Sequence, residues 1–279
     1  MRYLAVVVLL SACLVLIGCS SGPAPPQPGT PAFSWVGAKT AYHAGDYAKA
    51  NESLGNLLKR DSEYTSKAQP WALVLSSGIA HGAVELADTY KTGVGLNGPN
   101  SLALRRRAGD CLRAANGAAL PGVEVFRTFI QKNHDPQILL AFEYPPMNPV
   151  EPADLTRVAK GNPLSDSEAD VLQRVMIQRG VVYALGQVTG EPEKPFNVEE
   201  MFKAATVQIP RERFLFGMAE LLFEQAQLYD KKHIDDPRRA NLFCTEAVNA
   251  LNGVPEDKQV KDLRQRIQKL QKAMPFVIT

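Results

Sequence analysis

The chain has 279 residues, of which 45% are hydrophobic and 22% are charged, so it can bury a sizeable core as one or two domains. Its 31 Lys and Arg residues nearly balance its 29 Asp and Glu residues, which gives a net charge of +2. Proteins that bind nucleic acid mainly through phosphates need a surplus of cations on one face. The composition therefore argues against a nucleic-acid partner.

The N-terminal segment has the outline of a secretory signal peptide. Arg2 precedes an apolar stretch over residues 4–17, and a small residue stands before Cys19. As a helix this stretch would cover about 21 Å, which is short of the roughly 30 Å hydrocarbon core of a bilayer. We therefore expect residues 1–18 to be a signal peptide that is removed, and a permanent membrane span is the poorer interpretation.

Residues 16–19, Leu-Ile-Gly-Cys, resemble the lipobox of bacterial lipoproteins, in which the cysteine becomes the lipid-modified first residue of the mature protein. The resemblance implies that Cys19 carries a lipid such as palmitate and anchors the protein to a membrane. A second match to the lipobox ends at Cys13, but it would leave too short an apolar segment before the cysteine. The alternative to lipidation is an ordinary signal peptide that happens to contain a cysteine. In bacterial lipoproteins a residue such as Ser20, in place of an acidic residue, after the cysteine usually goes with sorting to the outer membrane. The resemblance therefore implies that the protein lies on the periplasmic face of the outer membrane.

Residues 19–32 form a proline-rich linker that begins with the lipidated cysteine. After Cys19 the linker contains five prolines and no charged residue. Such a segment favours extended polyproline geometry of about 3.1 Å per residue, so we expect a tether with a reach of roughly 40 Å.

Two further cysteines, Cys111 and Cys244, lie at helical apolar positions after the linker. The oxidising periplasm would permit a disulfide between them, but their positions favour buried, unpaired thiols.

Residues 33–279 carry apolar residues at the three- to four-residue spacing of helices, and no run alternates convincingly as strands do. Prolines and capping residues mark the helix starts, with capping boxes at Ser165 and Asn197. The helices predicted from these signals span 33–44, 46–60, 69–92, 101–116, 121–133, a short one at 136–142, 166–188, 198–208, 210–231, 237–251 and 255–273. The pattern predicts an all-α fold.

A proline-rich interval over residues 144–163 interrupts the helical pattern. It either joins two helical lobes, 33–143 and 164–279, or is an ordered loop within one superhelix. The sequence leaves both arrangements open, because prolines occur in linkers and in ordered loops alike.

The first predicted helix pair resembles the tetratricopeptide repeat. From position 38 onward it reads A-x-x-A-Y-x-x-G-D-Y-x-x-A-x-x-x-L, with small residues where the helices touch and Gly-Asp in the turn. Helical spacing places Ala38, Ala41 and Gly45 on the inner face of the first helix. A poorer match at residues 240–247 lacks the Gly-Asp turn. The resemblance implies an α-solenoid, an irregular TPR-like helical repeat, over residues 33–279.

In tetratricopeptide domains the first helix of each pair lines the concave surface, and Trp35, Lys39 and Tyr42 share one stripe of the first predicted helix. Two aromatic side chains around a cation could hold an extended peptide or an acidic terminus. The alternative is that Trp35 and Tyr42 only cover the end of the first repeat. The resemblance implies envelope proteins or peptides as partners, with these three residues as the candidate contacts.

The sequence leads us to expect no catalytic, cofactor or metal site. The string Gly-x-Gly-x-x-Gly at 93–98 follows a segment of helical period, whereas a dinucleotide site needs a strand there. The four histidines are scattered, without the spacing of metal ligands. His81 is expected to be a hydrogen-bonded core histidine, while Glu85 and Asp88 are expected on a solvated face.

These observations predict a membrane-anchored envelope lipoprotein without enzymatic activity. A helical repeat presents an extended surface, so we expect an interaction scaffold or adaptor in secretion, pilus, outer-membrane or cell-wall machinery. The alternative is an α-helical enzyme or small-ligand receptor whose site is assembled from distant helices, for example around His81, Glu85, Arg105 and Asp110.

Overall fold

The computed structural model describes residues 26–96, 98–145, 152–203 and 207–274, so the proposed signal peptide and Cys19 lie outside the described residues. The described chain forms ten helices and a single two-stranded sheet, which confirms the all-α prediction in its main content. Within these ranges, none of the helices combines the length and the apolar character that crossing a bilayer requires. In chain order the elements are α2 (Pro31–His43), α3 (Tyr47–Leu57), α4 (Thr65–Val94), α5 (Ser101–Lys132), β1 (Gln137–Leu140), α6 (Pro152–Ala159), α7 (Asp166–Thr189), α8 (Pro195–Phe202), β2 (Val207–Pro210), α9 (Arg211–Gln227), α10 (Pro237–Leu251) and α11 (Lys258–Ala273).

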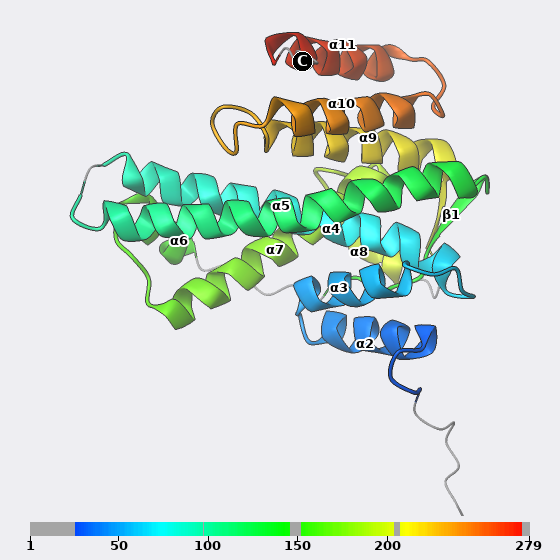
Figure 1. Cartoon of the computed structure of the whole chain (residues 1–279), viewed down its shortest axis with the longest axis horizontal. Coiled ribbons are helices and arrows are strands. Elements are labelled where there is room, and N and C mark those ends of the chain that lie inside the picture. The colour runs from blue at the N-terminus through cyan, green and yellow to red at the C-terminus, as the bar shows by residue number, and fades with distance from the viewer. Residues whose placement is uncertain (1–25, 97, 146–151, 204–206, 275–279) are drawn as a thin grey trace, which may run out of the picture.

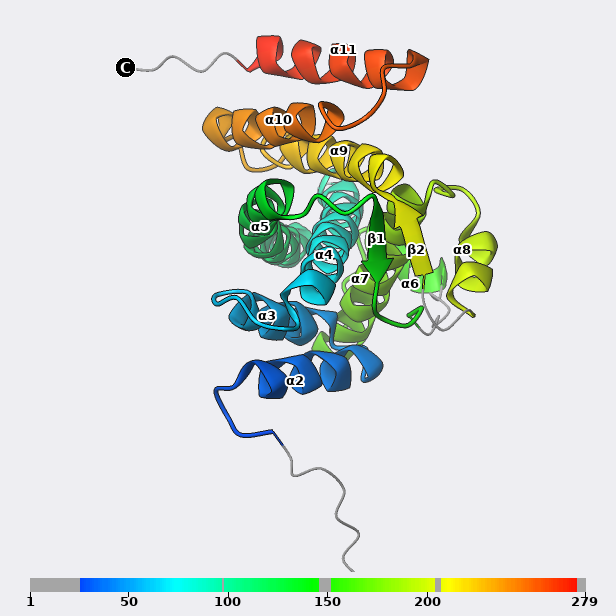
Figure 2. The ribbon, with the colours of Figure 1, turned by 90° about the vertical axis from the view of Figure 1, so that its right-hand side faces the viewer.

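The helices are stacked in layers along one axis of the molecule (Figure 1). Helices α2 and α3 form one end, α4, α5 and α7 cross the middle, and α9, α10 and α11 follow toward the other end, as the perpendicular view in Figure 2 also shows. A continuous apolar core runs from Ala38 in α2 to Met274 after α11. Strand β1, from the first half of the chain, pairs with β2, from the second. The layered order is consistent with a helical-repeat fold.

The first helix pair has the turn that its sequence predicts. Gly45 follows α2 in the left-handed region (φ +73°), and the N–H groups of Gly45 and Asp46 donate to the carbonyl oxygens of Tyr42 and Ala41. This pair of hydrogen bonds is the Schellman arrangement that satisfies the last carbonyls of a helix. The Asp46 side chain then caps the start of α3. Ala38 and Ala41 are buried, which confirms the predicted inner face of α2.

The segment over residues 136–142 contains strand β1 where the sequence predicted a short helix. Strand β1 pairs antiparallel with β2, so that Ile138 lies opposite Ile209 and Leu140 opposite Val207. These four side chains are buried, and the residues beside them in each strand are more exposed. Each strand has only four residues. An alternation this short cannot be distinguished from a fragment of helical pattern.

Several helix bounds also differ from the sequence prediction. Helix α4 begins at Thr65 with Pro70 inside it, α11 begins at Lys258, and the helix predicted over 198–208 ends at Phe202, before β2.

Helix α5 runs through Pro121 as one helix of 32 residues, although this proline predicted a new start. A helical proline displaces the carbonyl four residues earlier, which here belongs to Gly117, an exposed residue whose carbonyl water can reach. Helix α8 begins at Pro195 instead of at a capping box on Asn197, whereas the capping box at Ser165 is confirmed.

The glycine string at 93–98 begins inside α4 and follows no strand. A Cβ added at Gly93 would overlap the carbonyl oxygen of Val158 in α6, so this glycine permits two helices to touch. The helical context expected for the string is therefore confirmed for its described residues. Position 97 lies outside them.

Cys111 in α5 and Cys244 in α10 are free, buried thiols, as the sequence predicts. Burial raises the pKa of Cys111 to about 11 and that of Cys244 to about 12. Both side chains therefore stay protonated at neutral pH and act as small core hydrophobes.

Glycines bring α4, α7 and α9 to backbone contact. A Cβ added at Gly78 of α4 would lie 2.5 Å from the Cα of Val181 in α7, and one added at Gly180 of α7 would overlap the carbonyl oxygen of Gly78. Gly82 of α4 and Gly217 of α9 meet the α7 backbone in the same way. Any larger residue at these positions would force the helices apart.

We expect Gly180→Ala to destabilise the protein by at least about 2 kcal/mol, because the new methyl group must displace the backbone of α4. The matched control is Gly55→Ala in α3, where an added Cβ meets no atom within 4 Å. This control should stabilise the protein by about 0.5 to 1 kcal/mol through helix propensity alone. Denaturant unfolding followed by circular dichroism measures both changes, and equal effects would contradict the close helix crossing.

The carboxylate of Glu168 closes the capping box at the start of α7. It accepts hydrogen bonds from the backbone N–H and the hydroxyl of Ser165 and from Arg157 of α6, and these contacts lower its pKa from 4.5 to about 2. Because the folded-state pKa is depressed, the stabilisation is present above the ordinary pKa and is lost as the pH falls toward 2. Glu168→Gln should therefore lower the Tm near neutral pH and have a smaller effect near pH 3. Thermal melts at both pH values measure this difference, and a constant effect would contradict it.

Candidate functional site

The structure separates the three candidate partner-binding residues of α2. Trp35 is half-buried and packs edge-on against Trp71, with 5.4 Å between the ring centroids. Tyr42 is only 1% exposed, and its hydroxyl donates to the carbonyl oxygen of Glu143 at 2.7 Å. Lys39 is exposed. Lys39 and Tyr42 line one cavity, whereas Trp35 belongs to the aromatic packing beneath it.

This cavity, which we call the lysine groove, has a volume of about 430 Å³ and lies between α2, α4, the segment after β1 and α8. Aromatic side chains form its apolar part and lysines lie on its rim. The lining includes Lys39, Lys67, Lys203, Tyr42, Trp71, Phe142 and Phe202. Lys203 pairs with Glu200, while Lys39 and Lys67 make no ion pair with another described residue. The rim therefore carries cations that an anionic group could approach.

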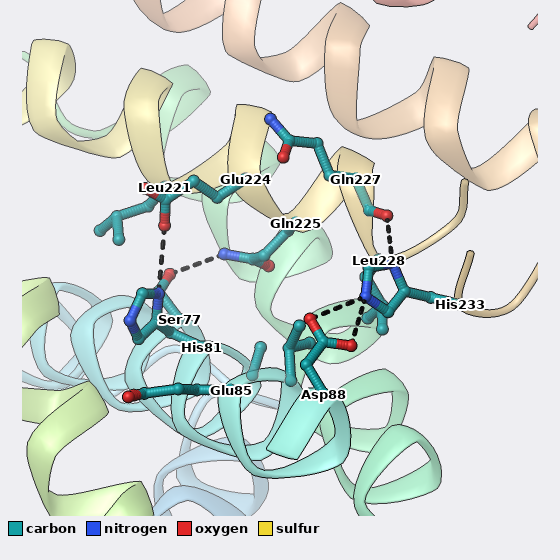
Figure 3. Close-up of a pocket in the computed structure, with 12 residues that line it drawn as sticks. Ser77, His81, Glu85, Asp88, Leu221, Glu224, Gln225, Gln227, Leu228 and His233 are labelled. Atoms are coloured by element: carbon teal, nitrogen blue, oxygen red, sulfur yellow. Dashed lines mark hydrogen bonds and ion pairs between the residues drawn. The ribbon is translucent and has the colours of Figure 1, made fainter. Parts of the chain in front are cut away.

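A second cavity of about 430 Å³ lies between α4 and α9, and we call it the α4–α9 pocket. One stripe of α4 forms one wall, a face of α9 forms the other, and His233 from the loop after α9 closes one end, as Figure 3 shows. The lining residues are Ser77, Ala80, His81, Val84, Glu85 and Asp88 from α4, Leu221, Glu224, Gln225, Gln227 and Leu228 from α9, and His233. The stripe follows from helical spacing, because residues three, four and seven apart share a face.

Three helices contribute to the polar group at one end of the α4–α9 pocket. The ring of His81 stacks on the ring of Tyr183 in α7, with centroids 3.9 Å apart. His81 Nδ1 lies 3.3 Å from one carboxylate oxygen of Glu224, and the Tyr183 hydroxyl donates to the other. The carboxylate of Glu224 points toward His81 in Figure 3. His81 therefore lines a pocket, and its expected place in the closed core needs correction, although its predicted hydrogen bond is present.

The electrostatics of this group keep Tyr183 neutral. Burial, together with the nearby charge of Glu224, raises the pKa of Tyr183 far above its ordinary value. Burial and the charge of Glu224 also raise the pKa of Glu220, one helical turn earlier on α9. Tyr183 is thus a permanent hydrogen-bond donor to the Glu224 carboxylate.

The other end of the pocket is closed by a histidine between carboxylates. His233 Nε2 lies 3.1 Å from Asp88, and its Nδ1 lies 2.9 Å from Asp230 and 3.1 Å from the carbonyl oxygen of Gln227. Acceptors surround both ring nitrogens, so the ring donates to both sides only when it is protonated. This contact ties the loop after α9 to α4.

Of the four residues named for an enzyme or receptor, the structure brings His81 and Glu85 into one pocket. Arg105 and Asp110 are exposed on α5, and Asp110 pairs with Arg113 on the same helix. Sequence reasoning missed Tyr183 and Glu224, which come from α7 and α9. Glu85 and Asp88 are solvent-accessible as expected, with side chains 42% and 54% exposed, and they also line this pocket. The only local signal was the polar stripe of α4 among apolar residues.

In the described part of the chain, no three His, Cys, Asp or Glu side chains are grouped so that they could hold a metal ion. The pocket instead combines apolar walls with carboxylates whose partners are histidine, tyrosine and basic side chains. Such a lining suits recognition of a ligand by shape and charge.

Tyr42 is a structural residue, because its ring is buried among aromatic neighbours. We expect Tyr42→Ala to destabilise the protein by about 3 to 5 kcal/mol, whereas Tyr42→Phe should cost only about 1 kcal/mol through the lost hydrogen bond to Glu143. Lys39→Ala should leave the Tm unchanged, since Lys39 is exposed. Chemical denaturation of the three variants checks this order, and a harmless Tyr42→Ala would contradict the buried position.

No family model, curated protein or solved structure matches this chain. The resemblances to a lipobox and to the tetratricopeptide repeat stay expectations carried by residues 16–19 and by the first helix pair. The lysine groove and the α4–α9 pocket are therefore interpreted from their own geometry and charge.

Proposed function

We propose that this protein is a membrane-anchored envelope lipoprotein that acts as an interaction scaffold or adaptor without enzymatic activity. A lipid on Cys19 would anchor it, residues 19–30, which precede α2, would be the tether, and the stacked helices would present the binding surface. The periplasmic face of the outer membrane is the proposed location, and the partner would belong to a secretion, pilus, outer-membrane or cell-wall assembly. The observation that carries the proposal is the lysine groove, which is lined in part by α2, the first described helix after the proposed tether.

The lysine groove suits an acidic or carboxylate-terminated peptide. Lys39 and Lys67 are exposed on its rim without an ion pair to a described residue, so their charges are available to a partner. Phe142 and Phe202 are partly exposed and offer aromatic surface to apolar side chains of the same peptide, while Tyr42 and Trp71, each 1% exposed, support this wall from behind. Part of the groove lies on α2, the first described helix after the proposed tether, so the length of the tether, roughly 40 Å, would limit how far the groove lies from the lipid anchor.

The test is affinity capture from native membranes with the double variant Lys39→Glu and Lys67→Glu. Reversing two rim charges should reduce recovery of the partner at least about tenfold by repulsion of its carboxylates. The matched control, Lys261→Glu with Lys269→Glu, makes the same charge change on exposed positions of α11 and should leave recovery unchanged. Equal recovery from all three proteins would contradict the lysine groove as the partner site.

The anchor is tested separately with Cys19→Ala. The natural chain should sediment with membranes and incorporate a labelled palmitate analogue, whereas the variant should do neither and should capture fewer membrane partners. Labelling that persists in the variant would contradict lipidation at this cysteine.

A receptor for a small ligand is the second candidate function, and the α4–α9 pocket favours it. The pocket brings together polar groups from α4, α7 and α9, which is the arrangement expected of a site assembled from distant helices. The two functions are compatible, because the lysine groove and the pocket use different residues.

A further inference from the structure

We propose that the α4–α9 pocket binds a small organic cation, namely a primary amine carried on a short alkyl chain. The inference rests on the second candidate function, a small-ligand receptor, and adds the chemical class of its ligand. It is independent of the scaffold function and of the lysine groove.

The size and the walls of the pocket suit an alkyl chain. Its volume of about 430 Å³ lies in the range of about 300 to 1,000 Å³ that is typical of small-molecule sites. Val84 of α4 is partly exposed and offers apolar surface to methylene groups, whereas Ala80, Leu221 and Leu228, each 1% exposed, form the buried backing of the cavity wall. Removal of a few methylenes from water would therefore contribute to binding.

Glu224 supplies the charge that selects a cation. Its side chain is 33% exposed, and its contacts in the described structure are the Tyr183 hydroxyl and His81. The Tyr183 hydroxyl is neutral, so it donates a hydrogen bond without cancelling the negative charge, and the basic side chain beside the carboxylate is the imidazole of His81. Within the described residues, no Lys or Arg lies within 4.0 Å of this carboxylate. An ammonium group beside Glu224 would provide the missing counter-charge.

The other carboxylates of the pocket differ from Glu224 because each already has a lysine or arginine partner. Glu85 lies 3.7 Å from Arg179, and Asp88 lies 3.6 Å from Lys91 and also contacts His233. No lysine or arginine is among the described residues that line the cavity. The pocket therefore repels an anion and directs an amine to one end.

The Glu224 carboxylate is already held in position before a ligand binds. Each oxygen of Glu224 accepts one hydrogen bond, from His81 or from Tyr183, and a carboxylate oxygen has a second lone pair for an N–H donor. The stacked rings of His81 and Tyr183 hold these donors in place, and the backbone contact between Gly82 and α7 keeps the two helices together beside them. Little ordering would be required when the ligand arrives.

The experiment is isothermal titration calorimetry of the full chain in detergent with 1,5-diaminopentane, 1,5-pentanediol and glutarate. These probes share a five-carbon skeleton and differ in charge. The diamine should bind at least tenfold more tightly than the diol, and glutarate should not bind. Added salt should weaken the binding of the diamine. A capped tripeptide with a central lysine shows whether the amine is taken as a free molecule or as a side chain. Equal binding of diamine and diol, or preference for glutarate, would overturn the proposal.

Glu224→Gln keeps the size of the side chain and removes its charge, so it should weaken diamine binding at least tenfold. The matched control is Glu52→Gln, which removes one charge from an exposed position of α3 and should leave binding unchanged. Val84→Phe, which fills the cavity from its wall, should abolish binding, and thermal melts establish that each variant is folded.

Undiminished binding by folded Glu224→Gln, or by folded Val84→Phe if the first variant does not fold, would refute the site. If none of the probes binds the natural chain, the amine site is refuted, and the proposed partner site at the lysine groove is not affected. Diamine binding without any captured partner would support the amine site and remove only the scaffold function.

Discussion

The backbone contact between α4 and α7 is the constraint on which the central layer depends. At Gly78, Gly82 and Gly180 the two backbones touch with no side chain between them, so these three positions fix the distance between the helices. His81 stands beside Gly82 on α4, and Tyr183 stands one turn after Gly180 on α7. The stacking of these rings at 3.9 Å is therefore a direct result of the glycine contact. Because α9 meets α7 through Gly217, the same contacts also place Glu224 against both rings.

Helix α4 connects two cavities of opposite charge. Its early part contributes Lys67 and Trp71 to the lysine groove, and its later part contributes His81, Glu85 and Asp88 to the α4–α9 pocket. Basic and acidic surfaces are thus separated along one 30-residue helix. The groove takes lining residues from α2, which lies at one end of the stack in Figure 1, whereas the pocket is lined by α4 and α9. A partner protein and a small amine could occupy the molecule together without competing for the same side chains.

Local signals in the sequence were sufficient for the helices and insufficient for the pocket. The turn at Gly45 and the capping box at Ser165 depend on neighbours within a few residues, and both are present as predicted. The four-residue strand β1 acquires its character from β2, a distant segment that periodicity cannot identify. Tyr183 and Glu224 were missed for the same reason, since each looks like an ordinary helical residue until three helices meet. For Tyr42 the sequence predicted the correct stripe of α2 but not the burial of the side chain, because that burial depends on the distant segment after β1.

The pairing of β1 with β2 has a consequence for how the chain folds. The two strands are separated by α6, α7 and α8, so their hydrogen bonds can form only after a long loop has closed. The helix pair α2–α3 requires no such closure and can form early, whereas completion of the central layer must wait for the second half of the chain. A proteolytic cut in the proline-rich interval would therefore not give two fragments that each fold alone. Each fragment would contain one strand without its partner and would expose one face of the shared core to water.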